Sequence, residues 1–223
     1  ENKMKLKSLY FIAFAVLMSC GNVKNEKTEA QKELANAEPV EVNATQEGLE
    51  KAYFASGCFW CVEAVYESVK GVKESISGYS GGTGKKPTYQ NYGKTDHAEA
   101  VEIIYDPEVV DFKTLVDVYF ASQNVTQQNG QGPDIGREYR SIIFYQNDAE
   151  KQIIEQKKAA LEKALGEPVA AEIKPFEKFW IAEAYHQNYE VQHPENPYIQ
   201  NVSIPRINRF KEKFPELLKA NSH

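Results

Sequence analysis

Cysteine is scarce in this 223-residue chain, which contains three: Cys20, Cys58 and Cys61. Three cysteines at these spacings are too few for a disulfide-stapled secreted scaffold, so each needs its own explanation. Positive charge is also limited, with 26 Lys and Arg residues against 32 Asp and Glu residues. Because binding to phosphates requires clustered positive charge, a chain with a formal net charge of −6 and no basic cluster excludes nucleic acid as a partner.

The N-terminus has the pattern of a secretory signal. Lys5 and Lys7 precede an apolar run from Leu9 to Met18. This run is shorter than the ~20 residues that a membrane span requires. Its ending, Leu-Met-Ser-Cys, resembles a bacterial lipobox, which predicts cleavage before Cys20 and lipidation of that residue. The alternative is an ordinary signal with an incidental cysteine.

These features predict three segments. Residues 1–19 would form a lipoprotein signal peptide, residues 20–47 a flexible tether that begins with lipidated Cys20, and residues 48–223 one folded domain. The tether has no aromatic residue and is too polar to bury a core, whereas the whole chain is 42% hydrophobic. We therefore expect a protein of the bacterial cell envelope, attached to a membrane through its lipid and facing the periplasm or the exterior.

The hydrophobic patterns after residue 48 predict an α+β fold. Short apolar or alternating runs indicate strands at residues 52–55, 101–105, 140–145 and 169–174. Apolar residues at helical spacing indicate helices after Cys58 up to about Gly71, after an Asp111 cap, from an Asp148 cap to about Leu165, and around residues 207–217. We expect a mixed sheet covered by helices, a two-layer sandwich of ferredoxin-like character.

The strongest chemical signal is the segment Gly57-Cys58-Phe59-Trp60-Cys61. It places two thiols three residues apart across the first turn of a predicted helix, where the helix dipole favours a thiolate at Cys58. Such a pair serves thiol–disulfide exchange, zinc binding, or a nucleophile with a resolving partner. Zinc is disfavoured because there is no second cysteine pair, and His97 and Glu99 follow the cysteines instead of preceding them. We predict no metal site.

An ordered set of motifs resembles the A-type peptide methionine sulfoxide reductases, which reduce oxidised methionine. The resemblance covers roughly residues 52–215 and is carried by Gly57-Cys58-Phe59-Trp60, Gly78-Tyr79-Ser80-Gly81-Gly82, Pro87-Thr88-Tyr89, His97-Ala98-Glu99-Ala100-Val101, Tyr105-Asp106-Pro107 and Gly136-Arg137-Glu138-Tyr139-Arg140-Ser141. It implies a peptide-methionine (S)-S-oxide reductase that acts on peptide-bound or free methionine sulfoxide.

The resemblance also implies residue roles. Cys58 would attack the sulfoxide sulfur and become a sulfenic acid, and Glu99 would protonate the oxygen, a step that needs a carboxyl group with a raised pKa. The residues implied to bind the substrate are Phe59 and Trp60 around its methyl group, Tyr89 and Tyr139 as hydrogen-bond donors to its oxygen, and Asp134. The family binds no cofactor and depends on an external reductant, here expected to be a thioredoxin-like protein.

The chain departs from the family in its supply of thiols. Ser122-Gln123-Asn124-Val125-Thr126 replaces a common His-Asp-Pro stretch, and no cysteine follows Cys61, although most relatives carry resolving cysteines near the C-terminus. We therefore expect Cys61 to resolve the sulfenic acid, with direct reduction by an external thiol as the alternative. Two other functions remain as alternatives: a general thiol–disulfide oxidoreductase that uses Cys58 and Cys61, and a non-catalytic lipoprotein.

Overall fold

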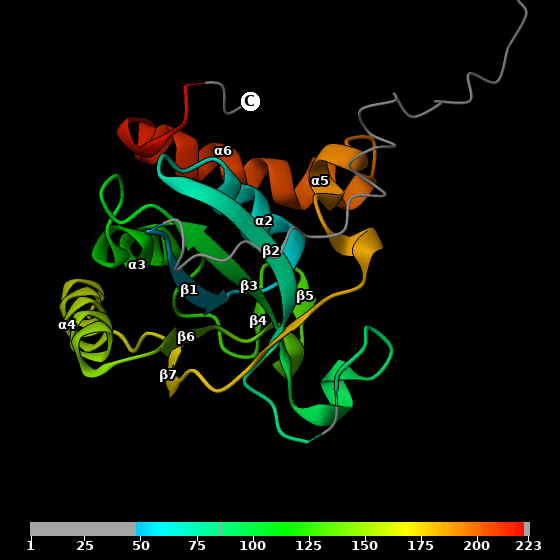
Figure 1. Cartoon of the computed structure of the whole chain (residues 1–223), viewed down its shortest axis with the longest axis horizontal. Coiled ribbons are helices and arrows are strands. Elements are labelled where there is room, and N and C mark those ends of the chain that lie inside the picture. Colours follow the sequence, from blue (N-terminus) through cyan, green and yellow to red (C-terminus); the bar gives the residue numbers. More distant parts are fainter. Residues whose placement is uncertain (1–47, 85, 221–223) are drawn as a thin grey trace, which may run out of the picture.

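The structure is a computed structural model that describes residues 48–84 and 86–220 (Figure 1). The expected signal peptide, Cys20 and the tether lie outside the described residues. Within the described part, no helix is both long and apolar enough to cross a membrane.

A six-stranded sheet forms the centre of the fold. Its strands lie in the order β7-β6-β1-β3-β2-β8, and all neighbours are antiparallel except β6 and β7, which are parallel. The sheet is therefore mixed, as expected. The strands are β1 (Glu50–Ala55), β2 (Val72–Ser80), β3 (Ala98–Tyr105), β6 (Ile142–Tyr145), β7 (Glu172–Pro175) and β8 (Phe179–Ile181).

Helices cover this sheet on one face and at one edge. Figure 1 shows α6 running across α2, and α4 near β6 and β7. The described helices are α2 (Phe59–Glu67), α3 (Phe112–Ala121), α4 (Asp148–Leu165), α5 (Tyr189–Gln192) and α6 (Ile204–Lys213). A short hairpin, β4 (Gly130–Gln131) and β5 (Asp134–Ile135), lies outside the main sheet. This arrangement confirms the α+β class.

Alternation along β1 explains how the sheet is buried on both faces. Successive side chains of a strand point to opposite faces, so Phe54 packs toward the helices while Tyr53 packs on the other side. The second face has no helix over it in the described structure; the segment between β7 and β8 covers it instead. Phe176 of that segment stacks on Tyr53 with ring centroids 3.6 Å apart. Cys58 and Cys61 pack in the same core cluster as Phe54, on the face that the helices cover.

Several predicted boundaries hold and others are wrong. Asp111 caps α3 as expected, because its side chain accepts a hydrogen bond from the Thr114 amide at 2.7 Å. The cap of α4 is Asn147 and not Asp148, since the Asn147 side chain accepts from the Glu150 amide. Helix α2 ends at Glu67, four residues before Gly71. The sequence prediction missed β2 and β8 altogether.

Candidate active site

Cys58 lies immediately before the first turn of α2, where the chain leaves β1. Gly57 makes this turn possible: its φ is +80°, and a Cβ placed on it would lie 2.4 Å from the Cβ of Gln131. A residue with a side chain would therefore be strained and would also collide with β4. Both nearby thiols are free and nearly inaccessible, with Cys58 at 7% exposure and Cys61 at 1%. The pair predicted from the sequence is thus buried at the start of a helix.

Glu99 of β3 is held against this helix start. Its Oε2 accepts a hydrogen bond from the Phe59 amide at 2.9 Å, and its Oε1 contacts the Tyr92 hydroxyl at 2.8 Å. The side chain is 2% exposed, and burial raises its pKa from 4.5 to about 8, although both hydrogen bonds lower it. A carboxyl group with this pKa is largely protonated at neutral pH. Glu99 therefore has the property that a general acid requires.

The two thiols differ in their proton affinity. Burial raises the pKa of Cys58 well above its usual value, and the neighbouring Cys61 raises it further. The expectation that the helix start favours a thiolate at Cys58 is therefore wrong for the free protein, because loss of solvent outweighs the dipole. The pKa of Cys61 is lowered to about 7, first by a hydrogen bond with Cys58 and then by the charge of Arg206. Cys61 is therefore the more readily ionised of the two thiols at neutral pH.

An aromatic wall stands beside Cys58. Trp60 stacks on Tyr189 with centroids 3.7 Å apart, and its indole N–H donates to Nδ1 of His186 at 3.3 Å. The His186 ring lies between Phe59 and Tyr89, at centroid distances of 4.9 Å and 4.4 Å. Burial lowers the pKa of His186 to about 4, so the ring is neutral and belongs to an apolar surface. Phe59 and Trp60 were expected here, whereas His186 was not.

The predicted phenols occupy unequal positions. Tyr89 is 39% exposed and stands at the rim, where its amide donates to Glu183 at 3.0 Å. The hydroxyl of Tyr139 lies 3.4 Å from that of Tyr92, which in turn contacts Glu99. The phenol that directly contacts the acid is therefore Tyr92, which no motif identified. Its neighbours in sequence, Asn91 and Gly93, gave no signal of this contact.

Asp134 lies on the thiol side of the site. The Tyr198 hydroxyl donates to Oδ2 of Asp134 at 2.5 Å and also lies 3.8 Å from the sulfur of Cys61. Asp134 is thus linked to the cysteines through Tyr198, a residue near the C-terminus that the sequence analysis did not single out. No local pattern marks Tyr198, because its partners are 64 and 137 residues away.

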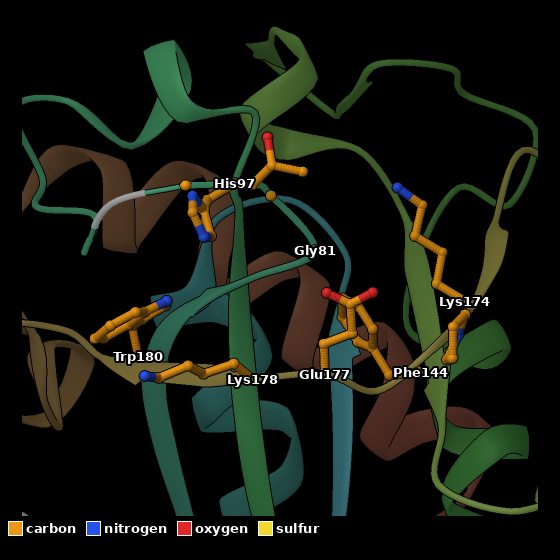
Figure 2. A pocket seen from close by; sticks show the side chains of 11 residues that line it. Gly81, His97, Phe144, Lys174, Glu177, Lys178 and Trp180 are labelled. Atoms are coloured by element: carbon orange, nitrogen blue, oxygen red, sulfur yellow. The ribbon is translucent and has the colours of Figure 1, made fainter.

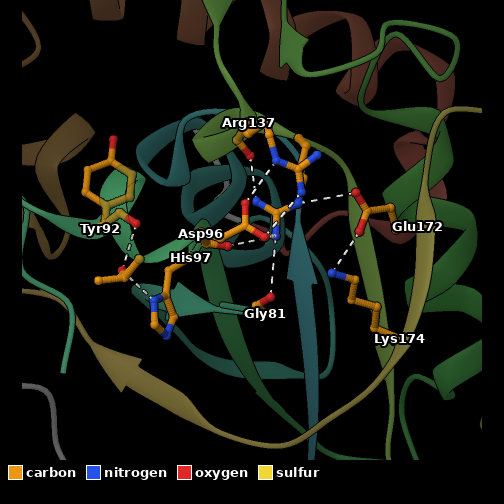
Figure 3. A network of polar contacts seen from close by, with 9 residues as sticks. Gly81, Tyr92, Asp96, His97, Arg137, Glu172 and Lys174 are labelled. Atoms are coloured by element: carbon orange, nitrogen blue, oxygen red, sulfur yellow. Dashed lines mark hydrogen bonds and ion pairs between the residues drawn. The ribbon is translucent and has the colours of Figure 1, made fainter. Parts of the chain in front are cut away.

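A buried arginine fixes the segments that carry Glu99 and Tyr139. Arg140 is 2% exposed and donates to the carbonyls of Arg137 at 2.7 Å, Asp96 at 2.9 Å and Gly81 at 3.4 Å. Figure 3 shows these contacts together with the ion pair between Arg137 and Asp96. Asp96 precedes β3 by two residues, and Gly81 follows β2 directly. The network therefore locks the entry to the Glu99 strand against the turn that presents Tyr139.

A separate cavity lies near β7 and β8. Its volume is about 570 Å³, and it is lined by Lys174 of β7, Glu177 and Lys178 of the β7–β8 connection, and His97 and Trp180 (Figure 2). Neither cysteine nor Glu99 lines this cavity, so it is separate from the candidate active site. Among residues 48–84 and 86–220, no group of three or more His, Cys, Asp and Glu side chains is arranged to hold a metal ion.

Comparison with known proteins agrees with this geometry. The family described as peptide methionine sulfoxide reductase matches residues 50–218. The chain is 43% identical over 172 residues to peptide methionine sulfoxide reductase MsrA of Pasteurella multocida, covering 76% of this chain and 99% of that one. It is 40% identical over 175 residues to MsrA of Saccharolobus solfataricus, covering 78% and 99%.

Solved structures give the same result. Methionine sulfoxide reductase A of Corynebacterium diphtheriae superposes with a TM-score of 0.62 at 31% identity, covering 69% of this chain and 79% of that chain. The reduced form of Mxr1 from Saccharomyces cerevisiae gives a TM-score of 0.64 at 31% identity, covering 67% and 88%.

Proposed function

The chain belongs to the MsrA family of peptide methionine sulfoxide reductases, and from this premise we propose how its residues carry the reaction. The chain reduces methionine sulfoxide to methionine. Cys58 attacks the sulfoxide sulfur, and Glu99 protonates the sulfoxide oxygen. The observation that supports this assignment best is the contact of the buried Glu99 carboxyl with the Phe59 amide, one residue after the Cys58 thiol.

The chemical step transfers one oxygen atom and two electrons. The thiolate of Cys58 bonds to the substrate sulfur while Glu99 protonates the sulfoxide oxygen. The sulfur–oxygen bond of the substrate then breaks, and the hydroxyl group bonds to the Cys58 sulfur and displaces methionine. The products are methionine, a sulfenic acid on Cys58 and the carboxylate of Glu99. The methionine sulfur is reduced by two electrons, and the Cys58 sulfur is oxidised by the same two. Cys58 releases one proton to solvent when it ionises, and Glu99 takes up one proton from solvent afterwards, so the complete step consumes no proton.

We assign substrate binding to the aromatic wall and the phenols. Phe59 and Trp60 contact the S-methyl group, because a methyl beside a large aromatic face gains a modest and shape-dependent attraction. Tyr139 and Tyr89 donate to the sulfoxide oxygen, and Asp134 acts with them on the thiol side. Such a three-sided site distinguishes the two epimers, and we assign the S epimer, whether free or within an oxidised protein under repair.

Cys61 is the resolving thiol in this scheme. Its pKa of about 7 makes about half of it thiolate at neutral pH, which suits attack on the sulfenic sulfur of Cys58. The new disulfide forms as water leaves, and an external dithiol must then reduce it. Since no cysteine follows Cys61, a thioredoxin-like protein is the reductant that we assign. A general thiol–disulfide oxidoreductase would have no need for the buried Glu99 carboxyl that contacts the Phe59 amide.

Two finer assignments are supported by other features. The sequence pattern of residues 1–20 supports a lipoprotein, anchored through Cys20 to a membrane of the bacterial envelope. Metabolic labelling with a radioactive fatty acid tests this anchor, and the label should be lost in Cys20→Ser.

The strand order β6-β1-β3-β2, with all neighbours antiparallel and helices α2 and α3 as crossovers, supports a ferredoxin-like core.

A single-turnover experiment tests the chemistry. The reduced full-length chain is mixed with each methionine sulfoxide epimer without reductant, and peptide mass mapping follows Cys58 and Cys61 separately. We expect one equivalent of the S epimer to be reduced and a Cys58–Cys61 disulfide to form. Cys58→Ser should reduce none, whereas Cys61→Ser should complete one turnover and stop as a sulfenic acid. Steady-state reduction by Cys58→Ser would refute the mechanism.

A further inference from the structure

Tyr92 is a buried phenol outside every motif that suggested the function. It begins a short turn, Tyr92–Thr95, between the Tyr89 segment and β3, and is 7% exposed. Its ring stacks on Tyr79 with centroids 5.0 Å apart and on Tyr89 at 5.8 Å. These contacts fix the hydroxyl, which lies 2.8 Å from Oε1 of Glu99.

The two oxygens of Glu99 are not equivalent. The Phe59 amide can only donate, so Oε2, which lies 2.9 Å from that nitrogen, must accept. A protonated carboxyl group that accepts at one oxygen carries its proton on the other. The acidic proton of Glu99 therefore resides on Oε1, the oxygen that Tyr92 contacts. A tyrosine hydroxyl can both accept and donate, unlike an amide.

We propose that Tyr92 is a positioning residue for the acid: its hydroxyl holds the proton-bearing Oε1 of Glu99 and switches from acceptor to donor when that proton is transferred. This inference rests on the proposed role of Glu99 as the proton donor. Tyr92 does not touch the sulfoxide in this scheme. It acts through Glu99, which it orients before the transfer and stabilises afterwards.

The hydrogen bonds balance on both sides of the step. Before transfer, Oε1–H donates to the Tyr92 oxygen, and the Tyr92 hydroxyl donates to the Tyr139 oxygen 3.4 Å away. For transfer, the Oε1–H bond turns from Tyr92 to the sulfoxide oxygen. Once the proton has moved, the Tyr92 hydroxyl turns and donates to the carboxylate. A charge-assisted hydrogen bond of this kind is stronger than the neutral one that it replaces. Tyr92 thus favours the product side of proton transfer.

Other ionisable groups also face Glu99, and the test must keep them constant. Asp134 and Cys61 raise the pKa of Glu99 through their negative charge, whereas the Tyr92 hydrogen bond lowers it. Other titratable groups that interact with Glu99 include Cys58, Tyr79, Tyr89 and Tyr139. Replacing Tyr92 with phenylalanine leaves all of these in place and keeps the ring that packs on Tyr79.

The experiment compares Tyr92→Phe with a matched control, Tyr53→Phe. Tyr53 also donates to a buried carboxylate, Glu102, at 2.8 Å, but on the opposite face of the sheet. Infrared titration of the resting full-length protein follows the carboxylic acid carbonyl band that disappears in Glu99→Gln. This assignment is needed because burial also raises the pKa of Glu63 to about 8.

We expect the titration midpoint of Glu99 to move upward by about one pH unit in Tyr92→Phe and to stay in place in Tyr53→Phe. The single-turnover rate should fall about tenfold at pH 7, and the pH at which its rise levels off should move higher by the same amount. An unmoved midpoint in Tyr92→Phe, or an equal movement in both variants, overturns the inference. Because the infrared titration needs no substrate, it stays informative if Glu99 turns out not to donate the proton.

Discussion

Replacement of Glu99 by glutamine is the most direct probe of the acid. Glutamine has nearly the same shape, and its amide oxygen can still accept from the Phe59 amide that contacts Oε2 at 2.9 Å. It cannot release a proton. The substitution therefore removes the acid while keeping the packing between β3 and α2.

The expected loss follows from the raised pKa. With a pKa of about 8, Glu99 is in its acid form for about 90% of the time at pH 7, whereas an exposed glutamic acid would be protonated about 0.3% of the time. Burial thus increases the available acid by roughly 300-fold at this pH. A positioned general acid contributes about 10²- to 10⁴-fold, so we expect Glu99→Gln to slow the first turnover by that factor.

The assay is the rate of sulfoxide consumption in one turnover, measured from pH 5 to pH 10 in a Cys61→Ser background. That background removes the thiol whose pKa is lowered to about 7 and leaves Cys58 to react. Ionisation of Cys58 increases the rate as pH rises, and loss of the Glu99 proton opposes this increase. The rate of the parent should therefore level off near the pKa of Glu99, which is about 8 with Cys61 in place and lower without it. Glu99→Gln should be slow, and its rate should keep rising through this range. A Glu99→Gln rate within threefold of the parent, or the same levelling in both proteins, would refute the assignment.

Three further substitutions probe the frame of the site by chemical denaturation. Arg140→Met should lower the free energy of unfolding by about 3 kcal/mol, since it leaves three carbonyls without their buried donor; an undiminished stability would contradict that role. Gly57→Ala should lower the free energy of unfolding more than Gly166→Ala does, by about 1 kcal/mol or more. Both glycines have a positive φ, but only the Cβ added at position 57 meets Gln131. Equal losses of unfolding free energy would exclude this collision. Burial raises the pKa of Glu63 to about 8, so Glu63 stabilises the fold fully below pH 4.5 and loses that contribution as pH rises through 8. Glu63→Gln should therefore reduce the free energy of unfolding that is lost between pH 5 and pH 9 by about 4 kcal/mol. Parallel plots of unfolding free energy against pH for the two proteins would show that Glu63 does not titrate in this range.

How far the fold followed from sequence depended on local signals. Helix α4 was predicted within one residue because an Asx cap and a terminal glycine frame it, and α3 because Asp111 caps it. Strand β2 was missed because both of its faces are covered: its last six residues are all buried, so small, polar and aromatic residues follow each other without alternation. Burial on two sides removes the period of two that identifies a strand.

The site was predictable only in part. Cys58 and Cys61 share one helical turn, so their proximity follows from spacing alone. The contact of Glu99 with the start of α2 joins residues 40 apart, and only the resemblance to a family suggested it. Tyr92 and Tyr198 were missed because a hydroxyl selects its partner through tertiary packing, and nothing in the adjacent sequence reports that selection. Likewise, the raised pKa of Cys58 depends on burial that spacing does not reveal.

The proposed resolution by Cys61 leaves the contacts of helix α6 in place. Arg206 of α6 is 7% exposed and donates to the Ser122 carbonyl at 2.6 Å and to the carbonyl and hydroxyl of Ser56 at 2.9 Å and 2.6 Å. These bonds attach α6 to the turn that precedes Cys58. With Cys61 one helical turn away from Cys58, the disulfide that we propose can form while Arg206 keeps its contacts and its charge continues to lower the pKa of Cys61. Resolution within α2, as we propose it, therefore requires no movement of α6.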